Sequence, residues 1–258
     1  PFVDSLKIDR NITILFSLHE GDSTIQLSPK SYFINFITNF NVVSLTLSES
    51  DLFDSIRGIY VDGINWQFDS LHNIKKNANY TKKWERPVYL EMFDSHGDII
   101  LDQHAGIRIF GGLTRHYPEK SLRLIARKKY GKSRFVGNIF ELGEKDYKNF
   151  VLRHSGNDYK QTRFKDVLST ELGSEVGLDV QGYAPAHLFV NSEYWGVYNI
   201  REKINKFFID NNHQTGIDDL NIIRGYKYLE EGNLNSFSSL VSFVKNNSLE
   251  SDSVFNKL

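Results

Sequence analysis

The chain has 258 residues, a formal net charge of −1 and a hydrophobic fraction of 40%. This length and composition predict a folded protein with one large domain or two small ones. The charge gives no reason to expect nucleic acid as the main partner. The lack of cysteine excludes disulfides, cysteine nucleophiles and zinc–thiolate sites. No apolar run reaches the length of about 18 residues that a membrane-spanning helix needs.

Short β-strands are predicted in the first part of the chain. Apolar, β-branched and aromatic runs at 12–16 and 32–37 are separated by Gly and Pro turns. Residues 1–40 are too few to close a sandwich, so we interpret them as the remnant of a preceding β-domain or as strands added to the main sheet. A further strand is predicted over 41–46, followed by a short helical turn that begins at Ser48.

Two hairpins are predicted next. Strands over 86–93 and 99–102 flank a turn that contains Asp94, His96 and Asp98. These side chains mimic a metal-binding spacing, but the glycine and glutamate of a Ca²⁺ loop are absent, so we interpret the segment as a hairpin turn. Strands over 106–110 and 121–126 form the second hairpin, around a long loop.

Strands and helices are both predicted in the second half. A strand is expected over 150–153, and the runs 183–190 and 196–200 predict a third hairpin around a turn at Asn191. Apolar residues at helical spacing predict helices over 163–176, 205–211 and 236–245. This order of elements predicts an α+β fold with a mainly antiparallel sheet.

The loop of the second hairpin carries residues suited to binding phosphate. Gly111 and Gly112 lack a Cβ, which lets backbone N–H groups approach an anion closely. Arg115 and Lys120 could neutralise the anion. Arg108, on the preceding strand, is either an exposed strand residue or a second phosphate contact. On composition alone, turn geometry explains the two glycines more simply.

Three stretches of sequence carry a family resemblance. They are NVVSLTLSESDLFDSIRGIYVDG at 41–63, GIRIFGGLTRHYPEKSLRLIARKKYG at 106–131 and FVNSEYWGVYNIREKI at 189–204. Together they resemble the CotH family, the spore-coat-protein-H-like atypical kinases, and the second resembles the family's Arg-x-x-Gly…Pro-x-Lys-Ser block. We therefore divide the chain into a β-rich segment, 1–40, and a CotH-like kinase domain, 41–258.

The resemblance implies ATP-dependent phosphoryl transfer, with Mg²⁺ or Mn²⁺, to serine or threonine of a protein substrate or of a surface or coat protein. It implies a bacterial protein that is secreted or exposed at the cell surface. It also implies a kinase-like small lobe followed by the start of a large lobe. Such chemistry needs a cation for the phosphates, acids for the metal and a carboxylate that orients the attacking hydroxyl.

The resemblance also implies roles for single residues. Lys120 becomes the best candidate for the cation that meets the phosphates. A kinase-type small lobe pairs this lysine with a helix glutamate, so Glu171 or Glu175 is expected to form that ion pair, unless both lie on a solvated helix face. Glu202 would lie at the edge of the nucleotide pocket, unless it is a surface charge at the end of a strand.

The acidic motifs of the family are missing from this chain. Its catalytic and metal-binding aspartates lie in motifs of the form Asn-x-Asp-Trp and Trp-x-x-x-Asp-x-Asp, and nothing after Ile204 matches them. We expect these residues downstream of Leu258, so that this chain shows no kinase turnover by itself. Whether the chain is an enzyme stays open. Because it begins at Pro1, we expect any leader to have been removed.

A non-catalytic extracellular module is the alternative function. Such a protein would bind carbohydrate or another protein, or would form part of a coat structure. Trp66, Trp84, Tyr117 and Tyr194 would suit stacking against sugar rings. At an aromatic fraction of 14%, an ordinary place in the core explains the same residues.

Overall fold

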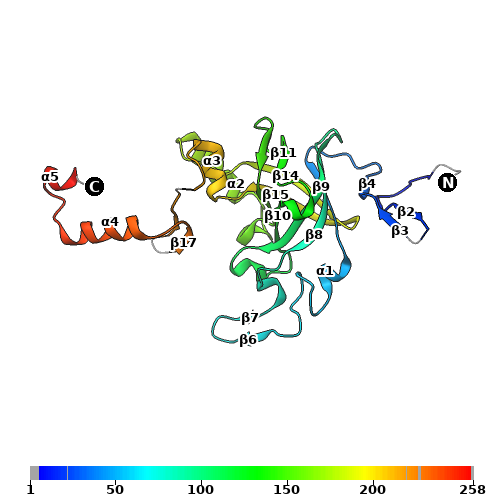
Figure 1. The fold of residues 1–258 in the computed structure, drawn as a ribbon, viewed down its shortest axis with the longest axis horizontal. Coiled ribbons are helices and arrows are strands. Elements are labelled where there is room, and N and C mark those ends of the chain that lie inside the picture. Colours follow the sequence, from blue (N-terminus) through cyan, green and yellow to red (C-terminus); the bar gives the residue numbers. More distant parts are fainter. Residues whose placement is uncertain (1–5, 22, 219, 226–227, 257–258) are drawn as a thin grey trace. The chain divides into compact units, whose positions relative to one another are not determined.

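The computed structural model describes residues 6–21, 23–218, 220–225 and 228–256 (Figure 1). The chain divides into two compact units, Pro1–Lys203 and Ile204–Leu258. Strands account for 35% of the chain and helices for 21%, so the protein is mostly β.

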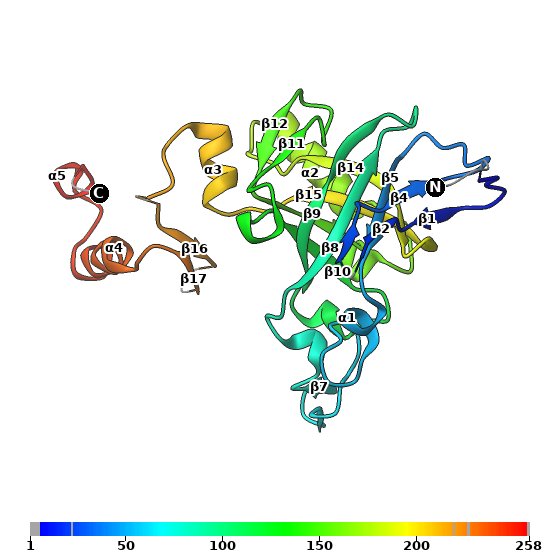
Figure 2. The same ribbon diagram turned by 45° about the vertical axis from the view of Figure 1, so that its right-hand side comes forward.

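A closed barrel of seven strands forms the body of the first unit (Figure 2). Its strands follow the order β10-β13-β15-β14-β5-β8-β9, and β9 pairs with β10 to close the ring. Neighbouring strands are antiparallel except for β14 and β5, which are parallel. The strands are β5 (Asn41–Thr46), β8 (Arg86–Phe93), β9 (Ile99–Phe110), β10 (Ser121–Ile125), β13 (Asn149–Arg153), β14 (Tyr183–Val190) and β15 (Glu193–Glu202).

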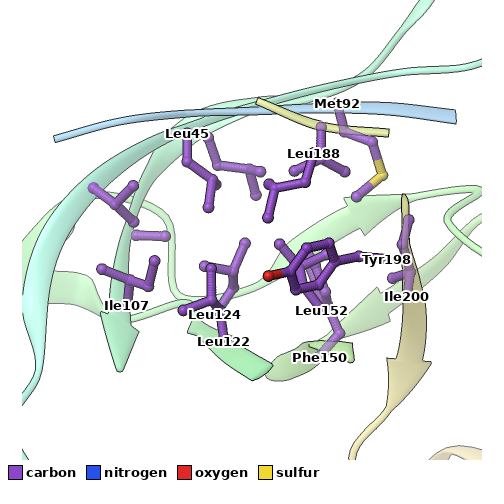
Figure 3. Packing of buried hydrophobic residues seen from close by; sticks show 14 of the residues in the cluster. Leu45, Met92, Ile107, Leu122, Leu124, Phe150, Leu152, Leu188, Tyr198 and Ile200 are labelled. Carbon is purple, nitrogen blue, oxygen red and sulfur yellow. The ribbon is translucent and has the colours of Figure 1, made fainter. Parts of the chain in front are cut away.

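Alternation along the strands fills the barrel with apolar side chains. Leu122 and Leu124 of β10 pair with Ile109 and Ile107 of β9, and all four are buried. Figure 3 shows Leu122, Leu124 and Ile107 gathered with Tyr198 in one cluster. Because successive side chains point to opposite faces of a sheet, the residues between them face outward.

The α+β fold class that the sequence predicted, with a kinase-like small lobe and the start of a large lobe, is wrong. The molecule is mostly β and its main sheet is a closed barrel. Closure depends on β5, which pairs with β8 on one side and with β14 on the other. A parallel pairing between strands far apart in the sequence leaves no turn signal, so local patterns could not predict it.

The strand segments themselves are confirmed. Residues 106–110 belong to β9, 121–125 to β10, 183–190 to β14 and 196–200 to β15. The hairpin between β8 and β9 is also confirmed. Its turn is closed by Asp94, whose Oδ1 accepts the backbone N–H of His96 at 2.8 Å and of Asp98 at 2.9 Å. This carboxylate therefore serves the turn.

The N-terminal segment adds two small strand pairs to the first unit. Ser31 contacts the barrel through Glu91, because its hydroxyl donates to Oε2 at 2.6 Å and its N–H to Oε1 at 3.3 Å. Of the run 32–37, predicted as a strand, Tyr32 lies in β4 and the remainder is not a strand; the ring centre of Phe33 lies 4.7 Å from that of Phe189. The pairs are β1 (Ile12–Ile14) with β4 (Lys30–Tyr32) and β2 (Ser17–Glu20) with β3 (Ser23–Gln26).

Short elements connect the barrel strands. The predicted helix over 163–176 is confirmed as α2 (Lys165–Glu175), but only its Val167 is buried, and Leu168 and Leu172 of its apolar face are exposed. The other connecting elements are α1 (Glu49–Phe53), β6 (Gln67–Asp69), β7 (Ile74–Lys76), η1 (Asn79–Thr81), η2 (Leu113–His116), η3 (Lys128–Tyr130), β11 (Phe135–Gly137), β12 (Lys145–Tyr147) and η4 (Gly156–Asp158).

The second unit contains helices and one small hairpin. The predicted helices are confirmed as α3 and α4, and Asn205 caps α3 by accepting the N–H groups of Phe207 and Phe208 on its side-chain oxygen. In the described part of the chain, no helix has the length and apolar character required to cross a membrane. The elements are α3 (Lys206–His213), β16 (Ile222–Arg224), β17 (Tyr228–Glu231), α4 (Asn235–Asn246) and α5 (Asp252–Phe255).

Candidate functional site

The loop between β9 and β10 begins with a conformation that requires glycine. Gly111 has a φ of 118°, and a Cβ on it would lie 2.7 Å from Oγ1 of Thr114. The following residues form η2, which holds Arg115 and His116. Gly111 therefore serves the turn, as composition suggested, and places the basic residues of η2 ahead of Lys120.

Lys120 carries a buried and weakly compensated charge. The residue is 5% exposed, and its Nζ donates to the carbonyl oxygen of Tyr117 at 2.6 Å. The same Nζ lies 4.3 Å from the ring centre of Tyr80 and 5.3 Å from that of Tyr60, where cation–π attraction stabilises it. Among the residues that the structure describes, no carboxylate lies within ion-pairing distance of this amine. Burial lowers the pKa of Lys120 to about 8.

A pocket of about 580 Å³ opens beside this amine. Part of its wall is the β6–β7 excursion, which contributes Phe68 and Lys75. Lys75 forms an ion pair with Asp62 and lies over the ring of Trp66, so its charge is already compensated. The pocket also has the aromatic walls Tyr60, Tyr80 and Tyr117 and the polar groups His116 and Asn73.

Three of the predicted site residues, Lys120, Arg115 and Arg108, carry positive charges that act on one another or on His116. His116 accepts or donates a hydrogen bond at 3.1 Å between its Nδ1 and the hydroxyl of Tyr80, and its pKa is lowered by burial and by the charges of Lys120 and Arg115. Arg115 donates from Nη1 to the carbonyl of Thr81 at 3.2 Å. Its pKa is lowered by burial and by the charge of Arg108. Lys120 and Arg115 therefore both act on His116, and Arg108 acts on Arg115.

Arg108 faces a second arginine. It pairs with Arg123 across β9 and β10, so two guanidinium groups stand on directly opposite positions of antiparallel strands. Like charges in this arrangement repel each other. Because Ile107 and Ile109 on either side of Arg108 are buried in the core, the two arginines lie on the outer face of the barrel.

Glu202 is engaged within the protein itself. The residue is buried, and its Oε2 accepts the N–H of Gly182 at 3.0 Å. Burial raises its pKa. Its own N–H donates to the Gly182 carbonyl at 3.2 Å, and its carbonyl accepts from Nε2 of Gln181. The backbone groups that a nucleotide edge would use already have partners, and a role of Glu202 in nucleotide binding stays a prediction.

The expected ion pair between Lys120 and helix α2 is not formed. Among the described ion pairs, the acid that α2 supplies to the sheet is Asp166, which lies 3.4 Å from Nε of Arg153 and 4.0 Å from Nη2 of Arg201. Glu171 acts electrostatically on Arg201, where it favours the charged form. Among the described ion pairs, none joins Lys120 to Glu171 or Glu175.

The aromatic residues proposed for sugar stacking pack against different partners. Trp84 packs against the core and against Arg86. The ring of Tyr117 stacks on Tyr159 at 5.0 Å, and Tyr194 packs against Phe189. No observation gathers them into one platform, so none favours the carbohydrate-binding alternative.

Two parts of the site differ from the sequence-based interpretation. The contributions of Tyr60 and Tyr80 were missed, because both residues lie far from Lys120 in the sequence and no local pattern marked them. Within the described ranges, no three His, Asp or Glu side chains are grouped closely enough to hold a metal ion. We therefore assign no residue of this chain as a ligand of Mg²⁺ or Mn²⁺.

The fold and the pocket together define a β-barrel protein with a basic, aromatic-lined pocket beside Lys120, the residue that precedes strand β10. The family model described as CotH kinase protein matches residues 107–255, a range that contains Lys120, Arg115 and Arg108. The match covers more than half of the chain, and the protein belongs to this family, as its sequence motifs predicted. No curated protein matches the sequence.

Proposed function

We propose that this protein binds the phosphate groups of ATP in the pocket beside Lys120, as the nucleotide-binding part of a CotH-type protein that transfers a phosphoryl group to serine or threonine of a protein substrate. The observation that carries the proposal is the buried Lys120 amine, which lacks an ion-pairing carboxylate among the described residues. A cation that has lost most of its hydration, and that only the more distant Asp62 compensates, favours the arrival of an anion.

The surroundings of Lys120 support a phosphate ligand over a single carboxylate. Arg115 and Arg108 extend the positive charge beyond the lysine, which suits a ligand with several negative groups, and the neutral His116 offers a ring nitrogen for a hydrogen bond. The aromatic walls offer Tyr60 and Phe68 for contact with a flat base. A protein phosphoacceptor and a secreted or surface location in bacteria are further parts of the proposal, and they rest on the family resemblance.

The role of Lys120 is tested by calorimetric titration with ATP in the presence of Mg²⁺. Lys120→Ala is expected to weaken ATP binding by about tenfold or more, because a charge-assisted contact is lost. Lys132→Ala is the matched control: this lysine lies in an exposed turn after η3 and should leave the affinity unchanged. Equal effects of the two substitutions would remove Lys120 from the site.

A further inference from the structure

The segment 117–121, which contains Lys120, is anchored on alternate residues. Tyr117, Glu119 and Ser121 each contact the loop 154–163, which follows β13. On the other side, the hydroxyl of Tyr60 donates to the carbonyl of Pro118 at 3.1 Å and accepts the N–H of Lys120 at 3.1 Å. The side chains of alternate residues are thus held by the loop, while the backbone of the residues between them is held by Tyr60.

The strongest of these anchors is a two-pronged ion pair. Nη1 and Nη2 of Arg163 donate to the two carboxylate oxygens of Glu119, each at 2.8 Å. Such a fork fixes orientation as well as distance. Beside it, Oγ of Ser121 lies 2.6 Å from Nδ1 of His154 and accepts the backbone N–H of His154 at 3.3 Å. Both neighbours of Lys120 in the sequence are thus fixed by one loop.

The loop is in turn fixed to β15. Asn199 donates from Nδ2 to Oγ of Ser155 at 2.8 Å and to the carbonyl of Arg163 at 2.9 Å. Arg163 also donates from Nη1 to the carbonyl of Val197 at 3.3 Å. Ser155 and Arg163 have φ values of 72° and 60°, a region that residues other than glycine adopt only where their surroundings hold them. This part of the loop is therefore built to keep one conformation.

We propose that Arg163 is a positioning residue that holds the Lys120 amine in the pocket by fixing Glu119 against the loop 154–163. The Lys120 amine itself is held by one acceptor, the Tyr117 carbonyl, which belongs to the same segment. If the segment shifts, amine and acceptor move together, and only the outside anchors oppose the shift. The consequence for nucleotide binding rests on the proposed function, whereas the positioning of the amine does not.

The test uses the full chain and the variants Arg163→Ala and Arg163→Lys. Arg127→Ala is the matched control, because Arg127 forms a similar two-pronged pair with Glu85, at 2.9 and 3.0 Å, just beyond the other end of β10. In protein labelled with ¹³C-lysine, the Cε resonance of Lys120, assigned with Lys120→Arg, is followed against pH. We expect its pKa to rise toward the ordinary value in Arg163→Ala, to rise less in Arg163→Lys, and to stay unchanged in Arg127→Ala.

ATP affinity supplies a second readout. We expect Arg163→Ala to weaken ATP binding about tenfold and Arg163→Lys to retain part of it, since misplacing a contact by about 1 Å is costly. An unchanged Lys120 titration in Arg163→Ala overturns the positioning role. If the wild type binds no ATP while the titration still shifts, the proposed function fails and the positioning role stands. If Arg163→Ala does not fold, Arg163→Lys, which keeps the charge but loses the fork, decides by the same titration.

Discussion

Two opposing effects act on the protonation of the Lys120 amine. Burial favours the neutral amine, while the faces of Tyr60 and Tyr80 and the Tyr117 carbonyl favour the ammonium. With a pKa of about 8, most molecules carry the charge at neutral pH. The affinity for an anion should then depend on pH over a range where an exposed lysine would not change.

ATP binding is predicted to weaken as the pH rises through about 8. Above this pKa the free protein loses the Lys120 proton that the phosphate complex needs, so binding must first restore it. Between pH 7 and pH 9.5 we expect the affinity to fall about thirtyfold. Calorimetric titrations at these two pH values measure the change. Lys120→Arg, which stays charged, should bind with little pH dependence, and an equal loss in this variant would contradict the argument.

The buried His154 imidazole is expected to lower the stability of the folded protein in acid. It is fully buried, and burial lowers its pKa to about 4, below the ordinary value of 6.5 that applies in the unfolded chain. Between these values the unfolded chain binds a proton that the folded one does not. The free energy of unfolding should therefore fall as the pH drops from about 6.5 to about 4, with about 2 kcal/mol lost by pH 5.

Urea unfolding of the wild type and of His154→Asn, at pH 7.5 and at pH 5, isolates this contribution. Asparagine can keep the hydrogen bond to Ser121 but does not titrate in this range. The loss on acidification should be smaller in the variant. The same loss in both proteins would assign the acid sensitivity to other groups.

For individual residues, the sequence predicted Lys120 and its basic neighbours as site residues, but it did not predict which side chains surround them. The glycine pair and the cations of one loop are visible within a few residues of each other. The rings of Tyr60 and Tyr80 that contact the amine come from a distant segment, so no local pattern could place them. Arg163 was predicted only as the start of a helix, because its pairing with Glu119 depends on the return of the chain from β13.

At the scale of elements, barrel closure depends on β5. Leu45 of this strand is fully buried in the core, and its neighbours pair with β8 and β14. Leu45→Ala should lower the free energy of unfolding by about 2–5 kcal/mol, because it removes buried contacts and leaves a cavity. Leu168→Ala, on the exposed face of α2, should change it by less than about 0.5 kcal/mol. Urea unfolding monitored by tryptophan fluorescence compares the two variants. Similar losses in the free energy of unfolding would contradict the importance of β5 for barrel closure.

The contrast between strands and fold class has the same physical origin. Hairpin strands such as β14 and β15 are indicated by alternating apolar and polar residues and by the turn at Asn191, so their existence could be predicted. The pairing of β5 with β14 arises from packing across the barrel. Because this pairing closes the sheet into a barrel, it decides the fold class. Helix α2 was found from its apolar spacing, yet most of that face is exposed, since spacing predicts a helix and not what covers it.

For the whole molecule, ATP binding should appear as stabilisation of the first unit, Pro1–Lys203, because the pocket belongs to it. A ligand that binds only the folded state adds RT ln(1 + [L]/Kd), or about 2.7 kcal/mol at a hundredfold excess over Kd. For a unit of this size, that corresponds to a rise of about 5–10 °C in Tm.

Differential scanning calorimetry with and without ATP measures this rise. It should vanish in Lys120→Ala and persist in Val244→Ala, a substitution in α4 of the second unit. A shift of equal size in the Lys120 variant would place ATP elsewhere on the protein. A wild type that shows no shift at saturating ATP would contradict nucleotide binding itself.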